Sequence, residues 1–132
     1  MQQLAQISLV VNDYDEAIHY YTHVLNFQLL EDTVLTPLKR WVVIQPKGTQ
    51  NSCTILLAKA ATDEQKLHVG NQTGGRVFLF LHTDNIIRDF ADYTSKGVEF
   101  LRPIQTEAYG RVTVFKDLYG NLWDLIEPTL RS

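Results

Sequence analysis

The sequence predicts an α+β fold made of two copies of one βαβββ module. Each copy begins with an apolar, strand-like stretch, followed by an aspartate that opens a helix-like run, Asp13 in the first copy and Asp84 in the second. The first run ends at Asn26 and the second at Gly97, so start and end both recur at a spacing of 71 residues. A repeat of this length indicates two supersecondary units that cannot close a core alone.

The first module is expected to span residues 1–59. Asp13 followed by Glu16 is typical of a helix capping box, and apolar residues recur behind it at helical spacing. Asn26 suits the left-handed conformation that ends a helix. Runs of apolar and β-branched residues, separated by proline and glycine, predict the strands. These strands are residues 4–11, 27–36, 39–45 and 53–58.

The second module, residues 75–132, is expected to repeat this order. Asp84 is predicted to cap a helix that ends at Gly97, and Gly120 supplies the positive φ needed in the turn before the last strand. The stripe of this helix expected to be buried consists of Ile87, Phe90, Ala91 and Thr94. The expected strands are residues 76–82, 98–102, 109–116 and 122–127.

A long connection, residues 60–74, separates the two modules. Its first part, Thr62–Lys66, suits one or two helical turns, whereas Gly70–Gly75 is rich in glycine and is expected to be mobile. Connections of this length inside compact domains often serve as lids or binding loops. The connection is also long enough for the modules to pair within one chain or to exchange between two chains.

Length and composition narrow the classes of function. A chain of 132 residues is expected to form a single domain, and a net charge of −3 without a basic cluster argues against nucleic-acid binding. No apolar run is long enough to span a membrane, and the first residues do not resemble a signal peptide. Cys53 is the only cysteine, so no internal disulfide can form. We therefore expect a cytoplasmic protein.

The doubled module and its closing motif resemble one known superfamily. With Asp13 opening the first helix and the motif Asp117-x-x-Gly120-Asn121-x-Trp123-Asp124 closing the second copy, nearly the whole chain resembles the glyoxalase / bleomycin-resistance / dioxygenase superfamily, also called vicinal oxygen chelate proteins. The resemblance implies a cupped eight-stranded mixed sheet with a helix backing each half. It does not fix the chemistry, because this superfamily contains metal-dependent enzymes as well as proteins that bind an antibiotic.

The resemblance also implies four positions at which metal-dependent members hold a divalent ion. These positions lie on the first and last strands of each module and are occupied here by Gln6, Leu56, Val77 and Asp124. Two of the four side chains are aliphatic, and one amide with one carboxylate makes a poor site for a divalent ion. We therefore expect no family metal, and no other cofactor.

Asp124 is the strongest candidate for a functional side chain. Strand alternation places it with Leu122 and Ile126 on one face, opposite Trp123, Leu125 and Glu127. If that face lines the cup, the carboxyl lies among apolar residues, and desolvation raises its pKa. The apolar residues expected around it are Val10, Leu56, Val77, Leu79 and Val112. Alternatively, Asp124 simply bonds to Gln6 or pairs with Arg40 or Arg111.

The predicted ligand-binding residues combine this acid with apolar and aromatic side chains. Trp41 and Tyr109 are placed at the mouth of the cup, where their rings would suit a cationic ligand. The complete predicted set is Gln6, Trp41, Leu56, Val77, Tyr109, Val112 and Asp124.

The four histidines do not form an obvious site. His19 and His23 have the spacing of some zinc sites on helices, but they fall opposite the apolar stripe and are expected to face water. His82 is expected to pack under the second helix with Phe78 and Phe80. His68 lies in the connection and can reach a ligand only if that segment folds over the site.

Three hypotheses about function follow. The first is a metal-independent protein that binds or sequesters a small molecule, as antibiotic-resistance members do. The second is an isomerase or lyase without a metal, in which Asp124 acts as general acid or base. The third is a divalent-metal enzyme with a rebuilt site of Gln6, Asp124 and a loop residue such as His68. In each case we expect a homodimer with two equivalent cavities.

Overall fold

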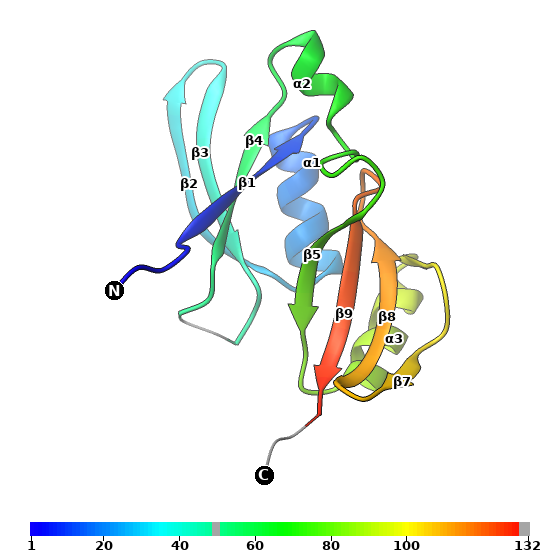
Figure 1. Ribbon diagram of the computed structural model, residues 1–132. Coiled ribbons are helices and arrows are strands. Elements are labelled where there is room, and N and C mark those ends of the chain that lie inside the picture. The colour runs from blue at the N-terminus through cyan, green and yellow to red at the C-terminus, as the bar shows by residue number, and fades with distance from the viewer. Residues whose placement is uncertain (49–50, 130–132) are drawn as a thin grey trace. The chain divides into compact units, whose positions relative to one another are not determined.

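The computed structural model describes residues 1–48 and 51–129 (Figure 1). The chain divides into two compact units, one ending at Val69 and the other beginning at Gly70. This division falls inside the connection predicted at residues 60–74. Each unit contains one βαβββ module, which confirms the α+β fold class, and the units are described separately below.

The first unit holds a four-stranded mixed sheet. Its elements are β1 (Gln6–Val11), α1 (Tyr14–His19), the π-helix η1 (Tyr20–Val24), β2 (Gln28–Thr36), β3 (Lys39–Gln45), β4 (Thr54–Lys59) and α2 (Asp63–Leu67). The strand order is β1-β4-β3-β2, with β1 parallel to β4 and the other neighbours antiparallel. Helix α1 lies against one face of this sheet (Figure 1).

The first helix begins and ends where the sequence predicts, but its second half is wider than expected. Asp13 accepts a hydrogen bond from the backbone N–H of Glu16 at 2.8 Å, and Asn26 ends the segment with φ 64°. Between them the α-helix becomes a π-helix at Tyr20, with the backbone N–H of Leu25 bonded to the carbonyl of Tyr20. Apolar spacing does not distinguish such a turn from an α-helix, so the sequence gives no warning of it.

The core of the first unit lies between its sheet and α1. Leu9 and Val11 on β1 pair with Leu57 and Lys59 on β4, and the aliphatic members of these pairs are almost completely buried. The neighbouring residues on β1 and β4 point to the opposite face, because side chains alternate along a strand. That opposite face carries Gln6, Ser8, Val10, Thr54, Leu56 and Ala58.

The second unit repeats the topology of the first. Its elements are β5 (Val77–His82), α3 (Ile86–Ser95), β6 (Glu99–Phe100), β7 (Gln105–Glu107), β8 (Gly110–Lys116) and β9 (Leu122–Pro128). The order β5-β9-β8-β6 is equivalent to β1-β4-β3-β2, with β5 parallel to β9. The short strand β7 pairs with β8 and was not predicted as a separate strand.

Helix α3 starts one residue later than expected and buries a different stripe. The side chain of Asn85, not Asp84, caps the helix by accepting from the backbone N–H of Arg88 at 3.0 Å. Ile86 and Tyr93 are the buried positions, whereas Ile87 is 54% exposed.

Three of the four residues predicted to be buried on α3, namely Ile87, Ala91 and Thr94, are therefore exposed. Only Phe90 partly agrees, with its ring 4.2 Å from that of Phe100. The prediction chose the wrong one of two possible stripes, because Ile86, Phe90 and Tyr93 also recur at helical spacing, one residue and therefore about 100° away.

The turn between β8 and β9 is organised by one buried carboxylate. Asp117, 5% exposed, accepts hydrogen bonds from the backbone N–H groups of Tyr119, Gly120 and Asn121 and from the Trp123 indole. Gly120 has φ 99°, as the sequence predicts. Trp123 then stacks on Phe115, at 5.9 Å between ring centroids, inside the core under α3.

The connection between the modules begins as predicted with a short helix. Thr62 caps α2 by accepting from the backbone N–H of Gln65 at 3.1 Å.

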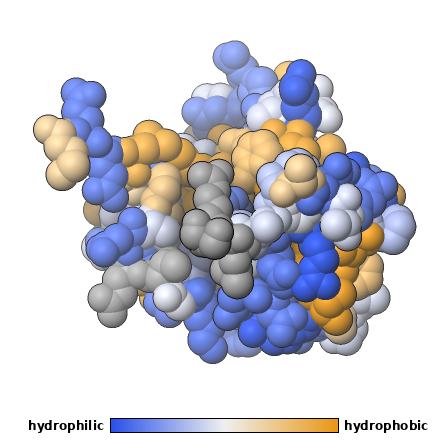
Figure 2. All heavy atoms as spheres, turned by 60° about the horizontal axis from the view of Figure 1, so that its bottom comes forward, coloured by the Kyte–Doolittle hydropathy of each residue, from blue (hydrophilic) through white to orange (hydrophobic). Residues whose placement is uncertain are grey.

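No helix within residues 1–48 and 51–129 is long and apolar enough to cross a membrane. Figure 2 shows apolar residues reaching the surface in patches among hydrophilic ones.

Candidate functional site

Strand β9 places Asp124 on the face of its sheet opposite α3. Trp123 and Leu125 are buried in the core, and the Glu127 carboxylate accepts from the backbone N–H of Ile86 at the start of α3 at 3.0 Å. These odd-numbered residues therefore face the helix, and alternation turns Asp124 to the other side. The orientation predicted from the sequence is confirmed.

Apolar side chains on the neighbouring strands border the carboxyl. Asp124 pairs with Val114 on β8 and with Phe80 on β5. Val114 is 8% exposed, but Phe80 is 64% exposed, so a large aromatic surface is open to solvent beside the acid. On its own strand, Asp124 stands between Leu122 and Ile126 on the same face.

A β-bulge on β5 changes which of its residues share this face. Val77 pairs with Leu122 as expected for the Asp124 face, but Leu79 pairs with Trp123 and turns to the helix side. The predicted place of Leu79 beside Asp124 was therefore wrong. An extra residue in a bulge inverts the alternation of those that follow it, and the sequence contains no sign of the bulge.

Because of the same bulge, the expectation that His82 packs under the second helix was wrong. His82 and Phe80 pair with Ile126 and Asp124, so they lie on the Asp124 face and not under α3. Both side chains are exposed. Phe80 and His82 are thus neighbours of the acid that sequence reasoning missed.

The three partners suggested for Asp124 are all engaged elsewhere. The Gln6 amide donates to the Thr54 hydroxyl at 3.1 Å. Arg40 pairs with Asp15 at 2.9 Å and with Asp32 at 2.6 Å, and Arg111 pairs with Glu127 at 2.6 Å. Among the residues that the structure describes, none donates a hydrogen bond to the Asp124 carboxyl.

The electrostatic consequence is a carboxyl that resists ionisation. Burial raises the pKa of Asp124 above its ordinary value, and the positive charge of Arg102 offsets only part of this effect. A half-buried acid without a hydrogen-bond donor is energetically unsatisfied in its charged form. It can be satisfied by a ligand that brings a cation or an N–H or O–H donor.

Three of the predicted binding residues belong to the first unit. Gln6 and Leu56 lie on the sheet face opposite α1, and Leu56 pairs with Val43 on β3. Trp41, two residues from Val43, points to the same face and is half-buried. The structure therefore brings all three onto one face of that sheet.

The remaining predicted residues belong to the second unit and differ in accessibility. Val77 is half-buried on the Asp124 face. Val112 lies on the same face by its pairing with Ile126, but it is 1% exposed and packs beneath the surface. Tyr109, 58% exposed, lies in the turn between β7 and β8.

The side chains at the four family metal positions do not fit a divalent ion. Leu56 and Val77 offer no donor atom, which leaves one amide and one carboxyl. Across residues 1–48 and 51–129, no three His, Cys, Asp or Glu side chains gather into a metal-binding group. His68 follows α2 in the first unit as its C-terminal cap residue and is exposed. A site without the family metal remains a prediction.

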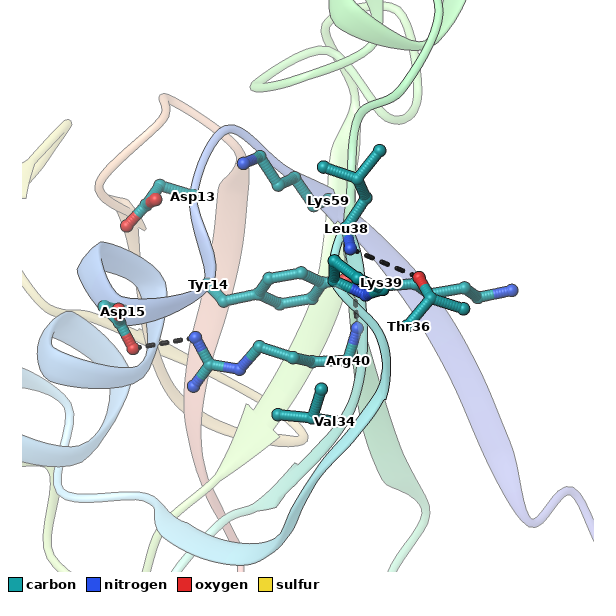
Figure 3. Close-up of a pocket in the computed structure, with 10 residues that line it drawn as sticks. Asp13, Tyr14, Asp15, Val34, Thr36, Leu38, Lys39, Arg40 and Lys59 are labelled. Atoms are coloured by element: carbon teal, nitrogen blue, oxygen red, sulfur yellow. Dashed lines mark hydrogen bonds and ion pairs between the residues drawn. The ribbon is translucent and has the colours of Figure 1, made fainter.

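A separate hollow of about 250 Å³ opens in the first unit between the start of α1 and the β2–β3 hairpin (Figure 3). The Tyr14 hydroxyl accepts from the backbone N–H of Arg40 at 3.2 Å, and the Arg40 guanidinium lies over the Tyr14 ring. The same guanidinium bonds to Asp15 and Asp32, which lowers the pKa of Asp32. These bonds join the hairpin to the helix, and none of the predicted binding residues lines the hollow.

Comparison with known proteins identifies the family. Residues 3–125 match the model of the Glyoxalase/Bleomycin resistance protein/Dioxygenase superfamily. The chain belongs to this superfamily. The resemblance inferred from the two helix-opening sites and the closing motif is thereby confirmed.

Individual relatives cover almost the whole chain. An uncharacterized protein of Shewanella frigidimarina is 53% identical over 127 residues, which are 96% of this chain and 93% of the relative. The crystal structure of UcmS2 has a TM-score of 0.82 and 25% identity, covering 96% and 98% of the two chains. TnmS3, an antibiotic binding protein from Streptomyces sp. CB03234, has a TM-score of 0.76 and 25% identity, covering 98% of both chains.

Proposed function

We propose that this superfamily member binds a small organic molecule on the Asp124 face of its second sheet, without the family metal. Binding of this kind would sequester an antibiotic-like compound. The fold similarity to TnmS3, an antibiotic binding protein, supports the ligand class. The aliphatic side chains Leu56 and Val77 at two of the four ligand positions support independence from a metal.

The observation that carries the proposal is the unsatisfied carboxyl beside an exposed aromatic ring. Asp124 is half-buried next to Val114, and Phe80 on the adjoining strand is largely exposed. A ligand with a flat apolar surface can cover Phe80, while a cationic nitrogen or a hydroxyl satisfies Asp124. The preferred ligand is therefore an aromatic compound with a donor group at one edge.

The proposal is tested by equilibrium binding of a panel of aromatic natural-product antibiotics, with and without amino or hydroxyl substituents. Asp124→Asn and Phe80→Ala should each weaken binding of the best compound by about tenfold or more, because each removes a buried contact. Glu107→Gln, an exposed carboxylate on β7, is the matched control and should bind normally. Equal affinity of the Asp124 variant and the wild-type protein would contradict the proposal.

A second candidate function is favoured by the raised pKa of Asp124. A carboxyl with this property is suited to general acid or base catalysis in an isomerase or lyase. Mass spectrometry of a bound compound after incubation separates the candidates. Conversion that stops in Asp124→Asn supports an enzyme, whereas recovery of the unchanged compound supports a binding protein.

The third hypothesis, a divalent-metal enzyme rebuilt around Gln6 and Asp124, is tested by metal analysis of protein purified without chelator. This hypothesis requires a stoichiometric metal ion that the substitution Asp124→Asn removes.

We also propose that the protein acts as a cytoplasmic homodimer. The sole cysteine, Cys53, suits a reducing compartment, and the exposed strand β2 offers an edge for a second copy.

A further inference from the structure

The exposed side of the first helical segment carries a pair of stacked imidazole rings. His19 ends α1 and His23 lies in η1, and their ring centroids are 4.4 Å apart with an interplanar angle of 19°. Both side chains are exposed to solvent, as the sequence predicts. Two histidines four residues apart on one helical face have the spacing at which a single metal ion can be held.

The hydrogen bonds around His23 determine which of its ring nitrogens carries the proton. His23 Nδ1 lies 3.0 Å from Thr22 Oγ1 and 3.3 Å from the carbonyl oxygen of His19. The Thr22 hydroxyl donates its only hydrogen to the carbonyl of Ile18 at 2.7 Å, so toward His23 it can only accept. Both neighbours of Nδ1 are therefore acceptors, and Nδ1 must carry the hydrogen.

This assignment leaves a ligand atom facing solvent. In a neutral ring with hydrogen on Nδ1, the lone pair is on Nε2. A hydrogen bond that holds one ring nitrogen while the other is free is the arrangement found around histidines that bind metals. The ring nitrogens of His19 make no hydrogen bond to any residue that the structure describes, so that ring can turn to meet a shared ion.

The π-helix helps to create this arrangement. Thr22 bonds back to the carbonyl of Ile18, a contact that loosens a helix at that turn. Thr22 itself lies in the widened turn at Tyr20–Val24, and from the same turn the His23 ring reaches the carbonyl of His19. Single π-turns of this kind are often found at functional sites.

We propose that His19 and His23 form a surface site for one first-row transition-metal ion, with water completing the coordination. Imidazole suits Zn²⁺, Ni²⁺ and Cu²⁺, and Cu²⁺ should bind most tightly of the three. The site uses neither Asp124 nor the other residues at the family's metal positions. It stands independently of the small-molecule function proposed above.

Calorimetric titration of the full-length protein with Cu²⁺ and with Zn²⁺ tests the site. The wild-type protein should bind one ion, and His19→Gln and His23→Gln should each lower the affinity by about tenfold or more. His68→Gln and His82→Gln are matched controls, since both replace exposed histidines elsewhere, and they should bind as the wild-type protein does. Asp124→Asn should also leave the affinity unchanged.

Two further measurements separate a positioned pair from accidental coordination. Thr22→Val removes the acceptor at Nδ1 and should weaken binding by about tenfold while both imidazoles remain. Nitrogen-15 NMR of the metal-free protein should show His23 with a protonated Nδ1 and an unprotonated Nε2. Unchanged affinity in His19→Gln and His23→Gln, absence of binding, loss of binding in Asp124→Asn, wild-type affinity in Thr22→Val, or the opposite tautomer would overturn the proposal.

Discussion

At the scale of single residues, Asp124 and Glu127 show how their surroundings shift the pKa values of two carboxyls on one strand, β9, in opposite directions. Asp124 is half-buried without a donor, and burial raises its pKa. Glu127, on the other face, accepts hydrogen bonds from Arg111 and from the backbone N–H of Ile86, and these bonds lower its pKa. The two groups should therefore affect stability with opposite dependence on pH.

Replacing Asp124 with Asn should stabilise the ligand-free protein at neutral pH. Because the folded-state pKa of Asp124 is raised, its contribution to stability is present below the unfolded-state pKa and is lost as the pH rises through the folded-state value. The difference in melting temperature between Asp124→Asn and the wild-type protein should therefore be positive at pH 7 and shrink as the pH falls. Glu127→Gln should behave in the opposite way, with destabilisation at pH 7 that fades in acid.

Asp117 should matter for folding and not for binding. Replacement by Ala leaves several buried N–H groups without an acceptor, and each unsatisfied group costs about 1–3 kcal/mol. Asp117→Ala should therefore lower the free energy of unfolding in urea by about 3 kcal/mol or more. Glu107→Ala, at an exposed position, should change it by less than about 0.5 kcal/mol. A similar small change in both variants would show that the buried network contributes little.

The local structural role of a residue was more predictable from the sequence than the bonding partner of its side chain. The helix-opening role of Asp13, the positive φ of Gly120 and the orientation of Asp124 follow from local rules on capping, turns and alternation. The partners of Arg40 and Arg111 do not, because sequence does not say which carboxylates the long side chains reach. Both were considered partners of Asp124, and both instead pair on the helix sides of their sheets.

At the scale of elements, two irregularities escaped prediction. The bulge on β5 adds one residue to a strand, and the π-turn of η1 adds one residue to a helical turn. Neither segment contains a proline or glycine from which the irregularity could be predicted. The bulge decides that Phe80 and His82, and not Leu79, lie beside Asp124. The π-turn brings His23 to the His19 carbonyl. The regular parts of the fold were predictable, and the irregular parts set the details of both candidate sites.

The segment that follows α2 is seated closely on the turn before β9. A Cβ atom added to Gly70, which has φ 74°, would lie 1.9 Å from the carbonyl oxygen of Tyr119. Gly74 has a similar φ of 69° but open space around it. Gly70→Ala should thus lose about 2–3 kcal/mol of stability through strain and steric overlap, and Gly74→Ala about 1 kcal/mol through strain alone. Equal losses in urea unfolding would contradict this close seating.

At the scale of the whole molecule, the repeated strand order explains why the fold could be predicted with so little ambiguity. Both sheets place the last strand of the module beside the first, β4 beside β1 and β9 beside β5. The sequence shows this repeat through the matching positions of helix starts and stops. The repeat does not say which side chains either sheet offers to a ligand, so the ligand itself could not be inferred from sequence.

Strand β2 is the edge at which we expect the proposed homodimer to form. It ends the strand order of its sheet, and its nine residues are all exposed, including Leu29, Val34 and Leu35. An exposed apolar edge strand favours pairing with another chain. Val34→Lys and Leu35→Glu should therefore shift a homodimer toward monomer by about tenfold or more, measured by sedimentation. Lys47→Glu is a control at an exposed loop position, and dissociation in that variant would point to another interface.

The most direct test of a metal-independent site around Asp124 is ligand titration of the wild-type protein and Asp124→Asn, each with EDTA and with added Zn²⁺. We expect the affinity of the wild-type protein to be the same in both conditions and that of Asp124→Asn to be about tenfold weaker in both. Loss of wild-type binding in EDTA with recovery in Zn²⁺, or equal affinity of the two proteins, would contradict this account.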